Sequence, residues 1–315
     1  MRILVVGAGG IGGYFGGRLL EAKRELTFLV RPHRQAQLAQ SGLQIRSPAG
    51  DVHIPAPPTV LENGISVPFD LVLLSCKAYD LEAAMASFAP AVGAETAILP
   101  LLNGMRHLDA LSVRFGSARV LGGDSVISVA LEADGTVHHL NNDHRLSFGE
   151  LDGSRSARAT AIEAAFSEAR FQSRLSGSIL QEMWEKWVFI ATAAGSTCLM
   201  RAAVGDIATA HAIDLVKILL VECAAIAARE GFRMRADFMQ ETEVTLTAPG
   251  STLTASMLRD IEGHRRIEAD HIIGDLLERN GPTTSLSLLR LAYAHLKAYE
   301  ARRTREATTP APTPR

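Results

Sequence analysis

The sequence is poor in aromatic residues and has no excess of charge of either sign. Aromatic residues make up 5% of the chain, so few rings are available on which nucleic-acid bases could stack. Lys and Arg number 32 and Asp and Glu number 34, which gives a formal net charge of -2. No basic surplus therefore predicts binding to nucleic acid or to an anionic membrane, and the expected partner is a small molecule.

The sequence also has few cysteines and no long apolar run. Cys76, Cys198 and Cys223 are widely separated and form no CxxC pair, so no disulfide framework is predicted and a reducing compartment is favoured. The apolar run that begins the chain breaks at Gly7, too early for a signal peptide. The most apolar later stretch, residues 187–200, is shorter than the roughly 20 residues that span a bilayer. We therefore expect a cytoplasmic protein that does not enter a membrane.

The first half of the chain alternates between strand-like and helical patterns. Apolar runs occupy residues 2–7, 26–30, 70–75 and 96–102, and helical patterns occupy residues 10–22 and 81–88. This alternation predicts parallel strands joined by right-handed helical crossovers. Around the turn pair Asp134-Gly135, residues 119–150 predict two antiparallel strands that could extend the sheet. We therefore predict an α/β domain over residues 1–175, which ends with a helix at 157–170 and a short extended run.

From about residue 178 the pattern is helical. Apolar periodicity predicts helices at residues 178–195, 206–230, 253–279 and 284–302, with a stop between the last two at Asn280-Gly281-Pro282. Residues 304–315 are rich in Thr, Pro and Ala and are expected to be disordered. The second predicted domain is therefore all-helical and covers residues 176–303.

A glycine-rich turn lies between the first predicted strand and the first predicted helix. Its GxGxxG pattern is formed by Gly7, Ala8, Gly9, Gly10, Ile11 and Gly12. The first glycine permits a tight turn, the second lets the backbone approach a pyrophosphate, and the third lets the helix pack closely on the strand. Because the helix N-terminus also attracts phosphate through its free N–H groups, the pattern predicts a Rossmann-type dinucleotide site.

The residues after the second predicted strand favour NADPH over NADH. NAD sites usually place an acidic residue here for the ribose 2′-hydroxyl. This chain instead has Arg31, and no acid before Asp51. The Arg31 guanidinium can form a charge-assisted fork with a 2′-phosphate, with Arg34 as a second candidate for that contact.

Several motifs further along the chain add to the glycine-rich turn and Arg31. They are Lys77 in LLSCKAYD, Asn103 and Gly104 in LLNGM, Lys186 in MWEKW and, in a late segment, Ser256, Met257, Asp260, Arg265, Arg266, Glu268 and Asp270. Together with the turn and Arg31, this set resembles the ketopantoate reductase family, the NADPH-dependent 2-dehydropantoate 2-reductases. The resemblance covers almost the whole chain and implies a Rossmann-type domain followed by a helical one.

The resemblance also implies hydride transfer from NADPH to the C2 carbonyl of a 2-oxo acid. Lys186 would protonate or polarise the carbonyl oxygen, on which negative charge develops in the transition state. Glu268 would orient Lys186 or a substrate hydroxyl, and Ser256 would hydrogen-bond the substrate. Lys77 and Asn103 would line the cofactor side of the site, with Asn103 also near the substrate. If the substrate is ketopantoate, the reaction belongs to pantothenate biosynthesis.

The spacing of Ser256 and Glu268 limits how they can share a site. They are 12 residues apart, which on one ideal helix places them about 120° apart. They cannot both face a site from the middle of that helix, so Ser256 is expected near its start.

The chain departs from the family at three positions. The family carries substrate-binding asparagines four and eight residues after the lysine and a third further along, where this chain has Ile190, Ala194 and Val204. A site built to bind a hydroxyl discriminates by about 10⁴–10⁵ only when its polar partners are present. We therefore expect a bulkier or more apolar 2-oxo acid than ketopantoate.

Other functions stay open at this point. An opine-type or 3-hydroxy-acid dehydrogenase also has a Rossmann domain followed by helices, and the lost asparagines leave room for a non-catalytic NADPH-binding redox sensor. Lys186 could be an ordinary surface lysine beside Glu182 and Glu185. No metal is expected, because the histidines in HHLNNDH lack a ligand spacing. A homodimer is expected from base rates alone.

Overall fold

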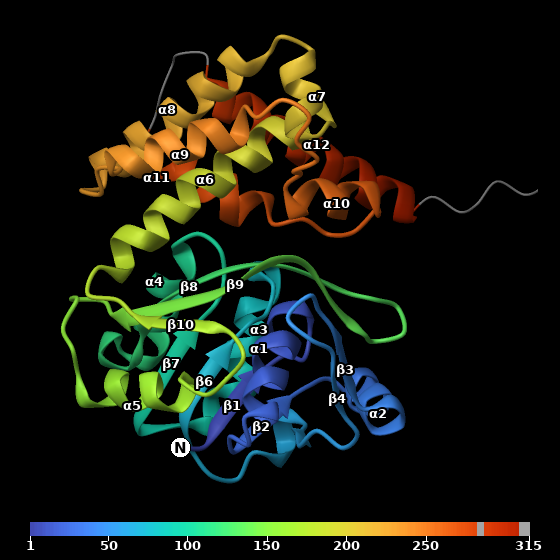
Figure 1. Ribbon diagram of the computed structural model, residues 1–315, viewed down its shortest axis with the longest axis vertical. Coiled ribbons are helices and arrows are strands. Elements are labelled where there is room, and N and C mark those ends of the chain that lie inside the picture. Colours follow the sequence, from blue (N-terminus) through green and yellow to red (C-terminus); the bar gives the residue numbers. More distant parts are fainter. Residues whose placement is uncertain (282–286, 309–315) are drawn as a thin grey trace, which may run out of the picture. The chain divides into compact units, whose positions relative to one another are not determined.

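The computed structural model describes residues 1–281 and 287–308, and the chain divides into two compact units, Met1–Met183 and Trp184–Arg315 (Figure 1). The division falls inside one helix, several residues beyond the boundary expected at 175/176.

Five parallel strands form the first sheet of unit 1, in the order β5-β2-β1-β6-β7. They are β1 (Ile3–Val6), β2 (Leu26–Leu29), β5 (Thr59–Val60), β6 (Phe69–Leu74) and β7 (Val92–Pro100). The connections between these strands contain α1 (Gly10–Glu21), α2 (Pro32–Ser41), α3 (Leu81–Phe88) and the short turns η1 (Glu62–Gly64), η2 (Ala78–Asp80) and η3 (Ala89–Ala91). Helix α4 (Arg106–Phe115) follows β7. The apolar runs of the sequence form these strands. A parallel strand is covered on both faces and is therefore apolar along its length. The predicted α/β class is confirmed.

A second sheet in unit 1 has the order β10-β9-β3-β4, with β8 antiparallel to β9. Its strands are β3 (Leu43–Arg46), β4 (Val52–Ile54), β8 (Leu121–Leu131), β9 (Val137–Glu150) and β10 (Gln172–Leu175), and η4 (Ser117–Arg119) and α5 (Ala157–Phe166) lie between them in the chain. The antiparallel pair is confirmed, but the expectation that it extends the first sheet is wrong. Its partners β3 and β4 are too short to show a clear alternation in the sequence.

Helix α1 packs against both sheets. A Cβ at Gly16 would lie 2.6 Å from the Phe28 ring in β2, and a Cβ at Gly17 would lie 2.5 Å from Ile45 in β3. The close approach on two sides therefore requires glycine, and apolar residues of both sheets join α1 in one core.

Two histidines of β9 lie beside α1. The Tyr14 hydroxyl and His144 Nδ1 are 2.7 Å apart, and the His139 and His144 rings stack with their centroids 5.7 Å apart. Burial, followed by the positive charges of His139 and Arg18, lowers the pKa of His144, against a smaller opposing effect of Asp143.

This depressed pKa predicts a pH-dependent stability. Because the folded-state pKa of His144 lies below an unfolded value of about 6.5, the unfolded chain binds more protons between these two values. The contribution to stability is therefore fully present above the unfolded pKa and is lost as the pH falls through the folded pKa. Denaturant unfolding between about pH 5 and 8 should show a shallower decline towards acid for His144→Gln than for the wild type, and equal declines would contradict this role.

Unit 2 is helical over the residues that the structure describes. Its helices are α6 (Ile179–Met200), which begins in unit 1, α7 (Val204–Thr209), α8 (Ile213–Arg229), α9 (Ala236–Leu246), α10 (Ser256–Glu262), the π-helix η5 (Asp270–Gly274), α11 (Asp275–Arg279) and α12 (Leu288–Thr308). The predicted helical character of this half is confirmed.

Two predicted helices are interrupted. The helix predicted over 206–230 divides into α7 and α8, and His211 between them has a left-handed φ of 58°. The helix predicted over 253–279 ends at Glu262, and His264 beyond it has a left-handed φ of 53°. Apolar residues continue through the first break. The second falls in residues 262–266, which carry no apolar side chain and include Gly263, the C-cap of α10.

The C-terminal helix is longer than expected. Helix α12 continues to Thr308, so residues 304–308 are helical where disorder was expected, whereas 309–315 lie outside the described residues. The expected start of the last helix at 284 and Pro282 of the expected stop also lie outside them.

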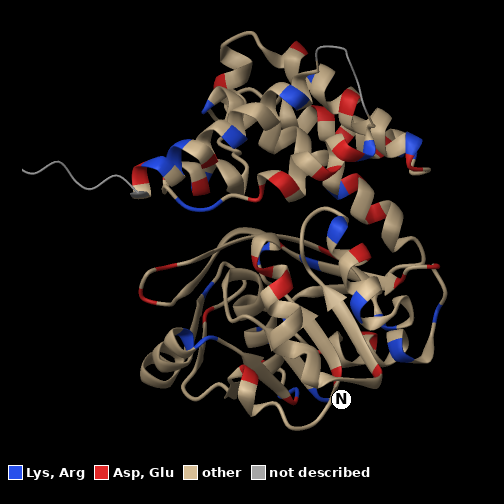
Figure 2. Cartoon of the chain, turned by 180° about the vertical axis from the view of Figure 1, so that it is seen from behind, with Lys and Arg blue, Asp and Glu red and all other residues tan. Residues whose placement is uncertain are grey.

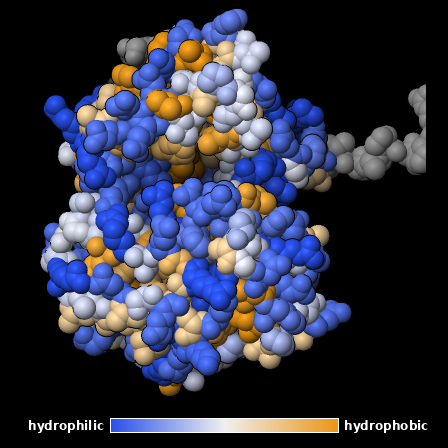
Figure 3. All heavy atoms as spheres, in the orientation of Figure 1, coloured by the Kyte–Doolittle hydropathy of each residue, from blue (hydrophilic) through white to orange (hydrophobic). Residues whose placement is uncertain are grey.

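The surface of the chain is mixed in charge and largely hydrophilic. Acidic and basic residues are interspersed along both units (Figure 2), and hydrophilic residues predominate on the face shown in Figure 3. Among the described helices, none is both long and apolar enough to cross a bilayer.

Candidate functional site

Four predicted cofactor residues follow strand ends that align at one edge of the parallel sheet. The last residues of β2, β1, β6 and β7 are register partners in a single row: Leu29, Val6, Leu74 and Pro100. The segments that follow these ends carry Arg31, Gly7, Lys77 and Asn103. The strand order reverses at β1, and dinucleotides bind at the carboxyl edge of such a switch point.

The glycine-rich turn has the geometry of a phosphate cradle. Gly7 adopts a φ of 94°, and a Cβ at Gly12 would lie 2.1 Å from Gly7 O and 2.2 Å from Ser75 Oγ. The Ser75 hydroxyl donates to Val6 O at 2.9 Å and so braces the turn from β6. At Gly9, by contrast, a Cβ would meet no atom within 4 Å. The surface at Gly9 is therefore open to a pyrophosphate, and Gly10 and Ile11 begin α1 with the N–H groups that would bind it.

Arg31 lies at the N-cap of α2, with its side chain 74% exposed. Its Nη2 is 3.1 Å from Asp80 Oδ2, in the η2 turn that follows β6. No sequence pattern indicates this contact, because Asp80 is far from Arg31 in the chain and reaches it only through the order of the strands. An exposed guanidinium that already holds one oxyanion can accept a phosphate in its place.

Arg34 lies against the turn rather than beside Arg31. Its Nε donates to Ala8 O at 2.9 Å and its Nη1 donates to Gln37 Oε1 at 2.5 Å. Burial lowers the pKa of the Arg34 guanidinium from its ordinary value. The expectation that Arg34 assists Arg31 at the 2′-phosphate therefore has no geometric support.

Lys77 and Asn103 have different surroundings at the carboxyl edge. Lys77 is exposed at the N-cap of η2. Asn103 is half-buried between β7 and α4, beside Gly104 with a φ of 76°. An ammonium group and an amide both carry hydrogen-bond donors suited to contacts with a bound cofactor.

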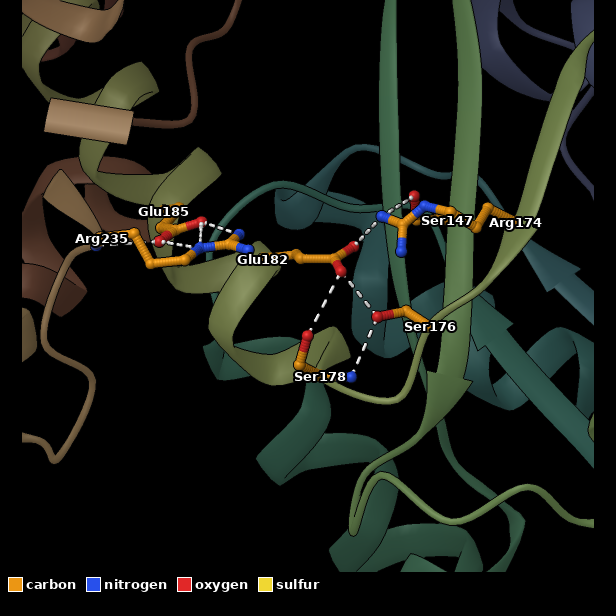
Figure 4. A network of polar contacts seen from close by, with 7 residues as sticks. All are labelled: Ser147, Arg174, Ser176, Ser178, Glu182, Glu185 and Arg235. Carbon is orange, nitrogen blue, oxygen red and sulfur yellow. Dashed lines mark hydrogen bonds and ion pairs between the residues drawn. The ribbon is translucent and has the colours of Figure 1, made fainter. Parts of the chain in front are cut away.

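The two glutamates before Lys186 on α6 bind arginines (Figure 4). Glu182 accepts from Ser176 Oγ at 2.7 Å and from Arg174 Nη2 at 2.6 Å. The side chain of Glu185 is 5% exposed and forms a two-pronged ion pair with Arg235, whose Nε lies 2.8 Å from Oε1. Both carboxylates thus have arginine partners.

The three positions that replace family asparagines differ in their surroundings. Lys186, Ile190 and Ala194 follow one another at intervals of four residues and so share one face of α6. Ile190 is half-buried and Ala194 is 3% exposed. Val204 is 1% exposed and packs in a core cluster with Ala193 and other apolar residues. Val204 therefore belongs to the core, and Ile190 is the replacement with the most accessible surface.

Ser256 and Glu268 do not share a helix, so the expected 120° relation on one helix does not apply. Ser256 is the first residue of α10 and is exposed, as its expected place near a helix start required. Glu268 is half-buried immediately before the helical residues, and its carbonyl accepts from Ile272 N at 2.9 Å. A carboxylate at a helix N-terminus is stabilised by the helix dipole.

Other members of the late segment have structural partners. Arg265 Nε donates to Asp260 Oδ1 at 2.9 Å, and Asp270 accepts from the Tyr293 hydroxyl at 2.7 Å and from Lys297 Nζ at 2.9 Å. Among the described residues, no group of His, Cys, Asp and Glu is arranged to hold a metal ion.

Two family models match nearly the whole chain. Residues 3–153 match the model described as ketopantoate reductase PanE/ApbA, and residues 178–300 match its C-terminal model. The chain belongs to the ketopantoate reductase family. It is therefore an oxidoreductase by family, as the motifs of both units predicted.

Relatives cover both units. The chain is 38% identical over 303 residues to the uncharacterized oxidoreductase YkpB of Bacillus subtilis, covering 96% of this chain and 99% of that protein. It is 26% identical to a 2-dehydropantoate 2-reductase of Mesorhizobium japonicum, covering 92% of this chain and 97% of the relative.

Solved structures share the fold. A 2-dehydropantoate 2-reductase from Geobacter metallireducens matches with a TM-score of 0.84 and 27% identity, covering 95% of this chain and 99% of its own. D-mandelate dehydrogenase, solved with NADH and anilino(oxo)acetate, matches with a TM-score of 0.86 and 23% identity, covering 96% and 100%. At 23% identity, the similarity to D-mandelate dehydrogenase shows a shared fold and nothing more.

Proposed function

We propose that this protein uses NADPH to reduce an apolar 2-oxo acid to the 2-hydroxy acid. The observation that carries this proposal is the face of α6 that Lys186 shares with Ile190 and Ala194. A cationic side chain is followed there by apolar side chains, where the family pattern has amides. The face suits an oxo group next to a hydrocarbon substituent better than a hydroxylated one.

The residues at the carboxyl edge of the sheet would bind the cofactor. The turn from Gly7 to Gly12 would hold the pyrophosphate on backbone N–H groups, and Arg31 would bind the 2′-phosphate. Lys77 and Asn103 would contact the cofactor from the ends of β6 and β7. When bound, NADPH supplies the hydride.

In unit 2, Lys186 would act on the carbonyl oxygen. An ammonium group stabilises the developing negative charge more strongly in the transition state than in the ground state, and it can supply the proton that completes the alcohol. Glu268 would orient Lys186 or the substrate, and Ser256 would hydrogen-bond the substrate carboxylate or oxo group. These roles follow the family pattern residue by residue.

Two further expectations belong to the proposal. If ketopantoate is the substrate, the protein serves pantothenate biosynthesis, although the apolar face of α6 favours other 2-oxo acids. The cytoplasm is the proposed location, which agrees with three cysteines that form no disulfide.

The choice of cofactor is tested by Arg31→Gln. Loss of a charged hydrogen-bonding partner worth about 1.5–3 kcal/mol should raise the Kd for NADPH by about 10–150-fold and leave the Kd for NADH nearly unchanged. Isothermal titration with both cofactors measures this. Arg155→Gln, which removes an exposed arginine paired with Glu163, should change neither Kd. A wild-type preference for NADH, or an equal loss of both cofactors in Arg31→Gln, would contradict the assignment.

A further inference from the structure

We infer that Arg34 is a positioning residue for the pyrophosphate cradle, and that the β8–β9 hairpin holds Arg34 in place. This inference rests on the proposed binding of a dinucleotide, but not on the choice between NADPH and NADH. The two arginines, Arg31 and Arg34, would then act on different parts of the cofactor.

The first step is the contact of Arg34 with the turn itself. Its Nε donates to Ala8 O at 2.9 Å, and Ala8 is 2% exposed. In a planar trans peptide the C=O and the following N–H point in opposite directions. By fixing the Ala8 carbonyl, Arg34 therefore directs the Gly9 N–H away from itself. The space next to Gly9 is open, and a pyrophosphate can approach the turn there.

The second step is the support that holds Arg34. Its Nη1 donates to Gln37 Oε1, and Gln37 Nε2 donates to Ala133 O at 3.3 Å in the turn between β8 and β9. At Gly135, where φ is 89°, a Cβ would lie 2.5 Å from Arg34 Nη1 and 2.4 Å from Gln37 Cδ. The hairpin thus closes tightly over the two side chains, which fixes the guanidinium at the turn.

The third step is the charge that Arg34 brings to this place. Its Nη2 is buried and has no hydrogen-bond partner among the described residues. A buried N–H donor of a cation without a hydrogen-bond partner lowers the stability of the fold unless an anion binds nearby. Next to the turn, that positive charge would favour a bound pyrophosphate in a region of reduced dielectric constant. Arg31, by contrast, is largely exposed and reaches Asp80.

The test measures the Kd values of the full-length protein for NADPH, NADH and adenosine 2′-monophosphate. Arg34→Gln should raise the Kd values for NADPH and NADH by the same factor, about tenfold for one charged hydrogen bond. It should leave the Kd for adenosine 2′-monophosphate unchanged. Arg31→Gln should give the reverse pattern, weakening NADPH and adenosine 2′-monophosphate only. Arg34→Lys, which keeps a cationic donor, should restore part of the loss.

Arg119→Gln is the matched control. Arg119 is also half-buried, and its Nε donates to a backbone carbonyl, Gly93 O, at 2.9 Å. Gly93 lies at the start of β7, at the opposite edge of the sheet, so this variant should keep all three Kd values.

Gln37→Ala keeps the proposal falsifiable if Arg34→Gln does not fold. It removes a support of Arg34 without touching the turn, and it should weaken NADPH and NADH equally by a smaller factor. A loss confined to NADPH would make Arg34 a 2′-phosphate ligand and overturn the inference, as would unchanged Kd values for both cofactors. If the wild-type protein prefers NADH, the proposed cofactor is wrong, but the expected equal loss of NADPH and NADH affinity in Arg34→Gln can still be tested. If the wild-type protein binds neither cofactor, both the proposed function and this inference are wrong.

Discussion

Replacing Lys186 by alanine is expected to lower kcat for 2-oxo acid reduction by about 10²–10⁴-fold, the usual contribution of a positioned proton donor. The ammonium would act mainly on charge that develops in the transition state, so the Kd for NADPH should stay unchanged. Steady-state NADPH oxidation gives kcat, and titration of the cofactor gives the Kd.

Lys217→Ala provides the control for this variant. Lys217 is a half-exposed lysine of α8 whose Nζ lies 2.7 Å from Glu243 Oε1, and its loss should leave kcat unchanged. A Lys186→Ala protein with wild-type kcat would contradict the assigned role and favour the interpretation of Lys186 as a surface lysine.

Replacing Ile190 by asparagine is expected to shift substrate preference by about 10–100-fold towards hydroxylated 2-oxo acids. The new amide would lie one helical turn after Lys186, where under the proposed function it would pair with a substrate hydroxyl. The ratio of kcat/KM for ketopantoate to kcat/KM for a branched aliphatic 2-oxo acid measures the shift.

Ile218→Asn is the corresponding control, because Ile218 lies on α8 with 53% of its surface exposed. It should leave the ratio unchanged. If Ile190→Asn also leaves it unchanged, Ile190 does not contact the substrate, and the apolar character of α6 at this point has only a structural meaning.

The parallel sheet and its cofactor edge could be predicted because their signals are local. Residues 3–6 and 71–74 are uninterrupted buried runs, and the glycine turn carries its geometry in its own sequence. The role of Arg31 stays a prediction that rests on the same kind of local signal, because a dinucleotide site binds the ribose 2′-substituent near the end of the second strand.

The contacts that refine the site could not be predicted, because they join distant segments. Asp80 reaches Arg31, and the Ala8 carbonyl reaches Arg34, only after the strand order is fixed. The break after α10 differs, because it had a local signal: residues 262–266 carry no apolar side chain and include Gly263, a residue that commonly ends a helix. The match of Val204 to a family asparagine stays a prediction, and only its burial shows that Val204 belongs to the core.

The substrate preference of the wild-type protein tests the central claim most directly. With saturating NADPH, kcat/KM is measured side by side for a branched aliphatic 2-oxo acid, phenylglyoxylate and ketopantoate. The apolar face of α6 predicts that at least one of the first two exceeds ketopantoate by about tenfold or more. Equal or better turnover of ketopantoate would contradict the proposed substrate class, and absence of any turnover with NADPH binding intact would contradict the enzyme itself.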